Sequence, residues 1–335
     1  MMDHANIAKI FDADVAESGR PYFVMELVRG MKITDYCDQK ELPTRERLDL
    51  FIKVCHAIQH AHQKGIIHRD IKPSNILVTL HDGVPVPKVI DFGIAKATQQ
   101  ELTDKTLFTQ FQQFIGTPAY ISPEQAEMSG LDIDTRADIY SLGVLLYELL
   151  VGQTPFDAKE MIQGGLDALR QIIREKEPLR PSTKLNTLPG EARTTAGKRR
   201  QTDVGKLVHQ LQGDLDWIVM TCLEKDRTRR YEPPNSLAAD IQHYLSDEPV
   251  VACPPSAAYR LRKFVRRNKG PVLAAAFVLL TLVAGIIGTT LALIEADRQR
   301  DLVDGQRQEL AERNRALQAA HEHERLLNER ARQAI

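Results

Sequence analysis

Three side chains suited to phosphoryl transfer lie close together in "HRDIKPSN", residues 68–75. Phosphoryl transfer needs a carboxylate that orients an attacking hydroxyl, oxygen ligands for a metal ion, and positive charge near the transferred group. Asp70 can serve as the base, Lys72 as the positive charge, and Asn75 as a source of an amide oxygen for magnesium. The spacing therefore predicts a site that acts on a phosphoryl group.

A second metal ligand follows in "DFG", residues 91–93. The carboxylate of Asp91 is a hard oxygen ligand, which suits a Mg²⁺ ion that keeps most of its waters. Gly93 allows the chain to turn immediately afterwards.

These motifs resemble those of the eukaryotic-type protein kinases, including the bacterial serine/threonine kinases. The resemblance covers about residues 3–247 and rests on three segments in the right order: "IIHRDIKPSNILV" at 66–78, "KVIDFG" at 88–93, and "GTPAYISPEQ" at 116–125, in which Ser122 replaces the usual alanine. It implies ATP and Mg²⁺ as cofactors and the Ser/Thr hydroxyls of proteins as acceptors.

The resemblance also implies roles for individual residues. The catalytic group comprises Asp70, Lys72, Asn75 and Thr117. ATP would be held by the Glu26 carbonyl, the Val28 amide, Leu77 under the adenine ring, and Asp91, with Met25 as gatekeeper. A structural group braces the site and comprises Arg69, Glu124, Asp138 and Arg230, in which Glu124 and Arg230 form a buried pair.

Arg69 precedes the proposed base, where an arginine of this family receives a phosphate from the activation loop. The corresponding segment here, about 94–115, offers Thr103, Thr106 and Thr109 as phosphorylation candidates. A phosphate of charge about −1.5 to −2 pairing with Arg69 would order that segment. The alternative is that these threonines are only turn residues.

The apolar pattern predicts an α+β fold. Residues 7–12 and 21–28 read as a β-hairpin, "NILV" and "PKVI" as two further strands, and residues 44–64 as a helix. Further helices are expected over 134–152, 214–225 and 236–247, and an exposed loop over 178–205. With the resemblance, this is a protein-kinase-like fold: a mostly helical C-lobe with a remnant small-lobe hairpin.

Residues 271–294 carry no charge and predict one transmembrane helix. At about 1.5 Å per residue the segment reaches roughly 36 Å, enough for a hydrocarbon core of about 30 Å. Six basic residues precede it within 260–269, so the positive-inside rule places residues 1–270 in the cytoplasm. The expected organisation is a kinase domain at 1–247, a basic juxtamembrane linker at 248–270, a single pass through the cell membrane at 271–294, and a charged helical segment at 295–335 on the opposite side.

The charged C-terminal segment leaves two interpretations open. Val303, Leu310 and Leu317 recur at the heptad spacing, which favours self-association through a coiled coil, but Gln306 and Arg313 occupy the intervening core positions. A solvated helix is the alternative. The lipid bilayer, protein substrates and a second copy of the chain are therefore the expected partners.

Two of the family's nucleotide-binding features do not occur in the sequence. It contains no G-x-G-x-x-G, and no lysine before the hinge lies in the expected strand, so we expect an N-terminally truncated kinase that transfers phosphate poorly by itself. The competing hypothesis is a non-catalytic, kinase-like membrane scaffold or binding module.

Composition also bears on nucleic-acid binding, disulfides and metal sites. Lys and Arg number 44 against 45 Asp and Glu, so overall charge gives no indication of nucleic-acid binding. The four cysteines have no C-x-x-C spacing and read as reduced thiols. His56, His60 and His62 read as surface histidines rather than as a metal site, because no acid or cysteine cluster accompanies them.

Overall fold

The computed structural model describes residues 3–17, 21–92, 118–127, 133–157, 161, 164–254 and 256–333. The chain divides into two compact units, residues 1–264 and 265–335. The first contains the predicted catalytic residues, and the second contains the apolar helix.

Two small antiparallel sheets lie in the first unit. β1 (Ile10–Val15) and β2 (Pro21–Met25) form the predicted hairpin, with Ile10 opposite Met25 and a bulge before Asp12. The second sheet has the order β3–β4–β5, with β3 at Met31–Lys32, β4 at Ile76–His81 and β5 at Val84–Val89. β4 and β5 are the two strands expected around the turn "HDGVP". β4 begins directly after the catalytic-loop motif, and β5 ends just before the DFG motif.

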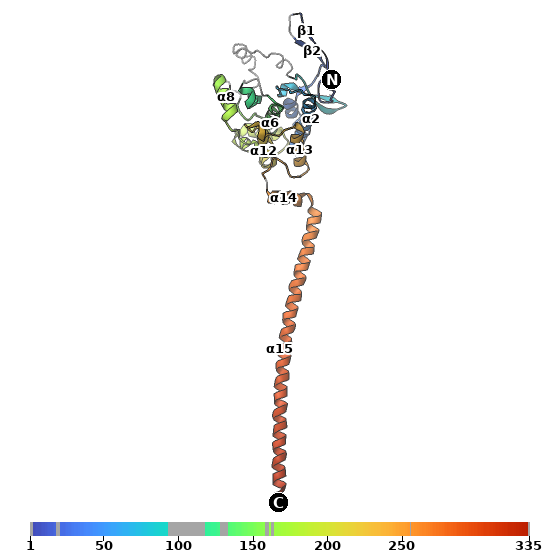
Figure 1. Ribbon diagram of the computed structural model, residues 1–335, viewed down its shortest axis with the longest axis vertical. Coiled ribbons are helices and arrows are strands. Elements are labelled where there is room, and N and C mark those ends of the chain that lie inside the picture. Colours follow the sequence, from blue (N-terminus) through green and yellow to red (C-terminus); the bar gives the residue numbers. More distant parts are fainter. Residues whose placement is uncertain are drawn as a thin grey trace. The chain divides into compact units, whose positions relative to one another are not determined.

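Helices form most of the first unit (Figure 1). Those surrounding the core are α1 (Ile33–Gln39), α2 (Thr44–Gln63), α6 (Arg136–Val151), α12 (Asp214–Cys222) and α13 (Pro234–Leu245). Other helices of this unit are η1 (Pro73–Asn75), η2 (Pro118–Tyr120), α5 (Pro123–Ala126), α8 (Gly165–Glu175) and η3 (Arg227–Arg229). The structure therefore confirms helices at three of the expected positions in the second half of the unit.

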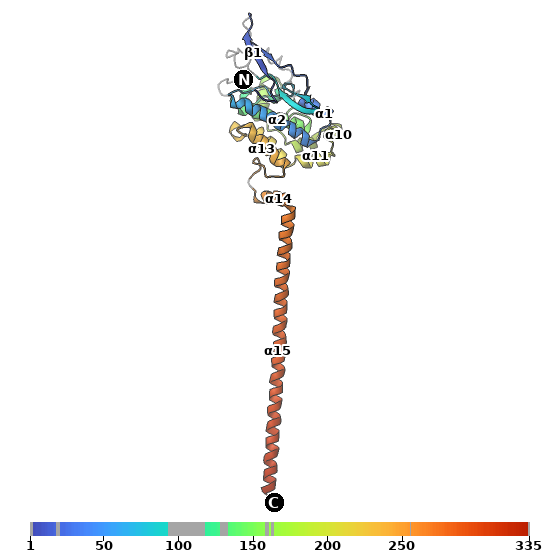
Figure 2. The same ribbon diagram turned by 90° about the vertical axis from the view of Figure 1, so that its right-hand side faces the viewer.

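α2 and α6 form the centre of the core. α2 buries Leu48, Phe51, Cys55 and Ile58 at helical spacing, as its sequence predicts, and the chain turns at Gly65 with φ +73°. α6 is buried on nearly every side, because α2, α9 (Pro181–Thr187) and α12 pack against it. α13 runs beside α2, as both views of the ribbon show (Figures 1 and 2).

The prediction of an exposed loop over residues 178–205 is wrong. This stretch forms α9 (Pro181–Thr187) and α10 (Gly190–Lys198) and leads into α11 (Val204–Leu211). Pro181 sits in the first turn of α9, where its missing N–H costs nothing. Arg200 is buried and donates from Nη2 to the Leu149 carbonyl at 2.9 Å, at the end of α6. Short helices with one buried side chain per turn leave too weak a periodic signal to separate them from a loop.

Most of the second unit is one continuous helix. α15 runs from Lys269 to Gln333 and includes both the apolar segment and the charged segment that follows it. Its apolar part has a mean hydropathy of 2.5 and is not buried, so one helix in the described part of the chain is long and apolar enough to cross a membrane. Val303, Leu310 and Leu317 are exposed on it; self-association through them stays a prediction.

Candidate active site

The residues of the catalytic-loop motif come together as predicted from the sequence. Asp70 Oδ2 lies 2.8 Å from Lys72 Nζ, and Asn75 Nδ2 donates to Asp70 Oδ2 at 3.1 Å and to the Asp70 carbonyl at 2.8 Å. Asn75 is buried, whereas about a quarter of the Asp70 side chain (26%) is exposed. The Asp70 carboxylate is thus held by two donors while part of it faces solvent, where a substrate hydroxyl can reach it.

The second sheet places Asp91 beside this loop. The Ile90 N–H donates to the Asn75 carbonyl at 2.9 Å, so the residue after β5 is tied to the residue before β4. Asp91 follows Ile90, is exposed, and has φ +55°. Aspartate tolerates the left-handed region better than most residues. The backbone segment that carries Asp91 is therefore tied to the backbone of Asn75.

Asp138, at the start of α6, is completely buried under the catalytic loop. Its Oδ2 accepts the His68 N–H at 2.8 Å, and its Oδ1 accepts the Arg69 N–H at 2.8 Å. His62 Nε2 also lies 2.7 Å from Oδ2, and its side chain is only 6% exposed. The expectation of a surface histidine is therefore wrong for His62, because the buried carboxylate gives its ring a polar partner inside the protein.

Arg69 has φ +63°, an unfavourable backbone conformation for a long side chain. Two polar groups hold it there: Asp138 accepts its N–H, and Gln125 Nε2 donates to its carbonyl at 2.8 Å. The sequence analysis missed Gln125. Its signal was the S-x-x-Q spacing of a capping box, since Ser122 and Gln125 cap α5 reciprocally.

The predicted pair of Glu124 and Arg230 is present. Nη1 and Nη2 of Arg230 donate to the two Glu124 carboxylate oxygens at 2.7 and 2.9 Å. The guanidinium also donates to the carbonyls of Glu224, Arg136 and Lys225. The Arg230 side chain is fully buried, so this fork ties α5 to the segment between α12 and α13.

The expected adenine-side residues lie at the junction of the two sheets. Glu26 donates its N–H to the Lys9 carbonyl at 2.8 Å, and its carboxylate lies 2.7 Å from Lys88 Nζ. The Lys88 hydrogen bond lowers the pKa of Glu26. Leu77 is half-buried and pairs across β4–β5 with Lys88, and Val28 is half-buried just past β2. Lys88 was not predicted from the sequence, and no local motif marks it.

His68 packs between the loop and the DFG segment. Its ring is fully buried, lies 4.7 Å from the Phe92 ring, and contacts the Ile90 carbonyl through Nε2 at 3.1 Å. The Asp70 N–H donates to His68 Nδ1 at 3.3 Å. These contacts fit a neutral ring, and burial lowers the pKa of His68 despite the nearby Asp138 and Asp70 carboxylates.

Several predicted residues lie outside the described part of the chain. They are Gly93, Thr103, Thr106, Thr109 and Thr117. Their roles stay predictions.

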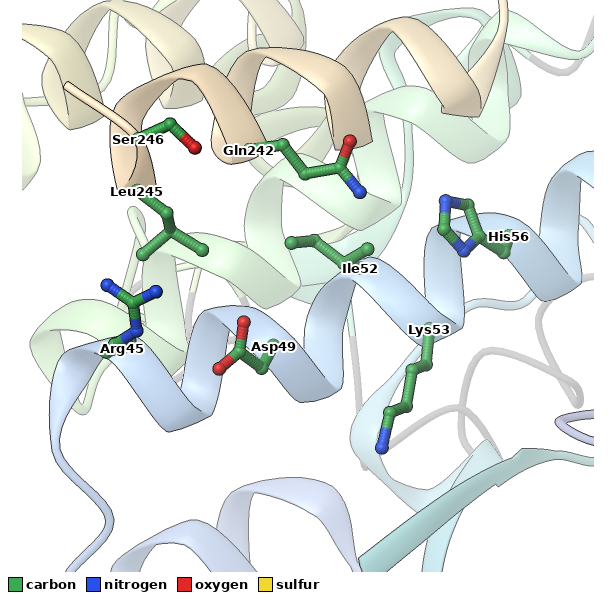
Figure 3. A pocket seen from close by; sticks show the side chains of 8 residues that line it. All are labelled: Arg45, Asp49, Ile52, Lys53, His56, Gln242, Leu245 and Ser246. Atoms are coloured by element: carbon green, nitrogen blue, oxygen red, sulfur yellow. The ribbon is translucent and has the colours of Figure 1, made fainter. Parts of the chain in front are cut away.

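A surface pocket of about 420 Å³ lies between α2 and α13 (Figure 3). Arg45, Asp49 and His56 line it from α2, and Leu245 from α13. None of the predicted site residues lines it, so we do not assign it to the active site.

Among the described residues no cluster of three or more His, Cys, Asp or Glu side chains could hold a metal ion. The four cysteines are free thiols, and three of them are buried.

The fold and the site geometry together define a protein kinase domain. A family model described as "Protein kinase domain" matches residues 1–242. The chain therefore belongs to the protein kinase family.

The relatives include serine/threonine-protein kinase PknB of Mycobacterium leprae, 33% identical over 253 residues, which cover 74% of this chain and 35% of that protein. PknB of Mycolicibacterium smegmatis is 35% identical over 245 residues, which cover 72% and 33%. This chain thus spans about a third of the length of these relatives. Among solved structures, the PknI kinase domain of Mycobacterium tuberculosis has a TM-score of 0.48 at 21% identity, covering 72% of each chain.

Proposed function

We propose that this chain carries the catalytic lobe of a serine/threonine protein kinase that transfers the γ-phosphoryl group of ATP to protein hydroxyls. The observation that supports it most is the position of the Asp70 carboxylate, between Lys72 Nζ and Asn75 Nδ2 on a loop braced by Asp138. Catalysis of phosphoryl transfer consists almost entirely of positioning and electrostatic stabilisation, and this loop supplies both.

In the proposed reaction the substrate hydroxyl approaches Asp70. A bond forms between the hydroxyl oxygen and the γ-phosphorus, the bond to the bridging oxygen breaks, and ADP leaves. Asp70 orients the hydroxyl and accepts its proton, and the Lys72 ammonium balances the charge on the transferred group. Thr117 is proposed to bond Asp70 and Lys72, as the resemblance implies.

Asn75 and Asp91 are the residues proposed to hold Mg²⁺. Their donor set fits, because both offer hard oxygens and the Asn75 amide nitrogen already faces Asp70, which leaves its Oδ1 as the ligand atom. When bound, Mg²⁺ supplies neutralisation of phosphate charge. Ser74 Oγ lies 3.2 Å from Asn75 Oδ1 and helps to fix the amide.

The adenine end of ATP is assigned to the sheet junction. The Glu26 carbonyl and the Val28 amide would meet the base, and Leu77 would pack beneath it. The ion pair of Glu26 with Lys88 fixes this segment against β5.

Arg69 is proposed to bind a phosphate on Thr103, Thr106 or Thr109. This contact would order the activation segment.

The test of catalysis is an Asp70→Asn substitution. Because the chain contains no glycine-rich loop, the assay uses it joined to a kinase small lobe that carries one, and follows transfer from labelled ATP to a generic serine/threonine substrate. Loss of the base should lower kcat by about 10²- to 10⁴-fold. Asp82→Asn, in the exposed β4–β5 turn, is the matched control. Unchanged turnover in the Asp70 variant would favour the non-catalytic scaffold.

Membrane anchoring through residues 271–294, with the kinase unit in the cytoplasm, is the second part of the proposal. The exposed apolar helix and the basic residues that precede it support this topology. A cysteine placed at Gln318 should react with an impermeant thiol reagent on intact cells, while one at Asp82 should not. The reverse pattern would overturn the topology.

A further inference from the structure

The juxtamembrane helix α14 (Ala257–Arg267) is attached to the kinase unit along one side. Lys263 Nζ lies 2.6 Å from Asp214 Oδ2, and the Tyr259 hydroxyl donates to Asp214 Oδ1 at 2.9 Å. The Tyr259 ring also meets Trp217 edge-on at 5.6 Å. Both ion-pair side chains are almost buried, at 11% and 10% exposed. The side of α14 that carries Tyr259 and Lys263 is therefore already occupied.

The segment before α14 is also fixed. Asp240 accepts the N–H groups of Val251 and Ala252 at 2.7 and 2.9 Å, and Val250 is buried. The stretch expected as a linker thus packs on α13 and α12. Such contacts limit how α14 can turn relative to the kinase unit, so its remaining sides have a defined direction.

The opposite side of α14 is apolar and exposed. Leu261 lies two positions from both Tyr259 and Lys263, which places it on the far side of a helix with about 3.6 residues per turn. Leu261 is 62% exposed and Phe264, one turn along, is 55% exposed. Val265 follows Leu261 by four positions on the same face of the helix and is 40% exposed. The three side chains form an exposed apolar strip on one side of α14, and such a strip favours contact with an apolar environment.

Basic residues flank this apolar strip. Arg260 and Arg262 lie on either side of Leu261 and are exposed. No aspartate or glutamate occurs between Glu248 and Glu295, so the whole stretch is positive up to the apolar segment. A helix with an apolar strip between cationic side chains is the type that lies in the headgroup region of a membrane with anionic lipids.

We infer that α14 lies on the bilayer surface, with Leu261 and Phe264 in the headgroup region and Arg260 and Arg262 on anionic lipid phosphates, while Tyr259 and Lys263 hold the kinase unit to it. The inference rests on the proposed membrane crossing, since the apolar segment begins at residue 271, within reach of the same surface. It adds a lipid class, anionic headgroups, and a fixed attachment of the kinase unit.

The test uses the full chain in nanodiscs, with an environment-sensitive dye on Leu261→Cys in a Cys253→Ser background, because the other three cysteines are buried. Discs of phosphatidylcholine alone are compared with discs that also contain phosphatidylserine. The dye should emit at shorter wavelength and be quenched by lipid-borne spin labels, more strongly with phosphatidylserine. The same dye on Asp82→Cys, in the β4–β5 turn, should report water in both discs.

Arg260→Gln with Arg262→Gln is the variant that tests the anionic contact. Each basic residue near an anionic surface is worth about a fivefold change in partitioning, so the double variant should weaken the preference for phosphatidylserine discs by about 25-fold, while Arg266, Arg267 and Lys269 keep the rest. Water-like emission at position 261 in both discs, from chain that resists alkaline extraction, would overturn the inference, as would equal burial in both. Chain that is released by alkali would instead refute the membrane crossing, and this inference with it.

Discussion

The Arg69 backbone N–H donates a 2.8 Å hydrogen bond to Oδ1 of Asp138, a residue 69 positions further along the chain. This bond holds Arg69 at φ +63°, a conformation that a long side chain avoids in an unconstrained chain. Because Asp70 follows immediately, the direction of the proposed base depends on a carboxylate in α6. The brace is therefore expected to affect catalysis without touching substrate.

Asp138→Asn should weaken both activity and stability. An amide can accept only one of the two backbone bonds, and its NH₂ group would face an N–H donor, so a buried donor is left unpaired. We expect a loss of about 1–3 kcal/mol in unfolding free energy. Denaturant unfolding measures this loss. In the chain joined to a kinase small lobe, kcat should fall by a larger factor than KM rises. Wild-type stability in this variant would show that the catalytic loop keeps its conformation without the Asp138 carboxylate.

Gln125→Glu separates the two roles of Gln125. Glutamate can still accept the Ser122 N–H and keep the cap of α5, but it cannot donate to the Arg69 carbonyl, 2.8 Å away. Because the Arg69 carbonyl loses its donor, we expect a loss of about 1–3 kcal/mol in unfolding free energy and a several-fold lower kcat. Gln125→Ala, which loses both roles, is the comparison variant. Equal kcat in wild type and Gln125→Glu would mean that Asp138 alone positions Arg69.

Arg230→Met should be strongly destabilising. It leaves the Glu124 carboxylate, 13% exposed, without its cation, and removal of one partner of a buried pair costs about 3–5 kcal/mol. Combining it with Glu124→Gln should cost less than the sum of the single changes, because no unpaired charge remains. The control is Arg229→Met, whose side chain is 69% exposed and should matter by less than about 1 kcal/mol. Additive losses would contradict a coupled pair.

His68 should make stability depend on pH. Burial lowers its pKa from the usual 6.5, so below that pH the unfolded chain takes up a proton that the folded chain resists. The neutral His68 ring contributes fully to the unfolding free energy above about pH 6.5. This contribution is lost as the pH falls from there towards the pKa that His68 has in the folded chain. His68→Gln should therefore flatten the loss of unfolding free energy on acidification. Parallel pH curves for the two proteins would exclude this assignment.

The sequence by itself determined the local features. The catalytic-loop and DFG motifs, the hairpin, the helix ending before Gly65, and the apolar segment follow from residue type and spacing over short distances, where backbone preferences and periodic burial act. The resemblance added Asp138, Glu124 and Arg230 as braces, which no spacing rule would have connected. The local signal failed over 178–205, where the short helices α9 and α10 bury only a few small or polar residues and one leucine, so the stretch reads as a polar loop.

Tertiary structure alone decided which distant groups meet. Glu26 with Lys88, Arg69 with Gln125, and Asp214 with Lys263 are joined across 62, 56 and 49 positions. Each pair forms because packed elements bring polar groups together where burial makes an unpaired charge or donor costly. The sequence carries no local trace of that requirement, since both partners would be ordinary solvated side chains in an isolated strand or helix. The packing of α5, α12, α14 and the two sheets fixed which residues form these pairs.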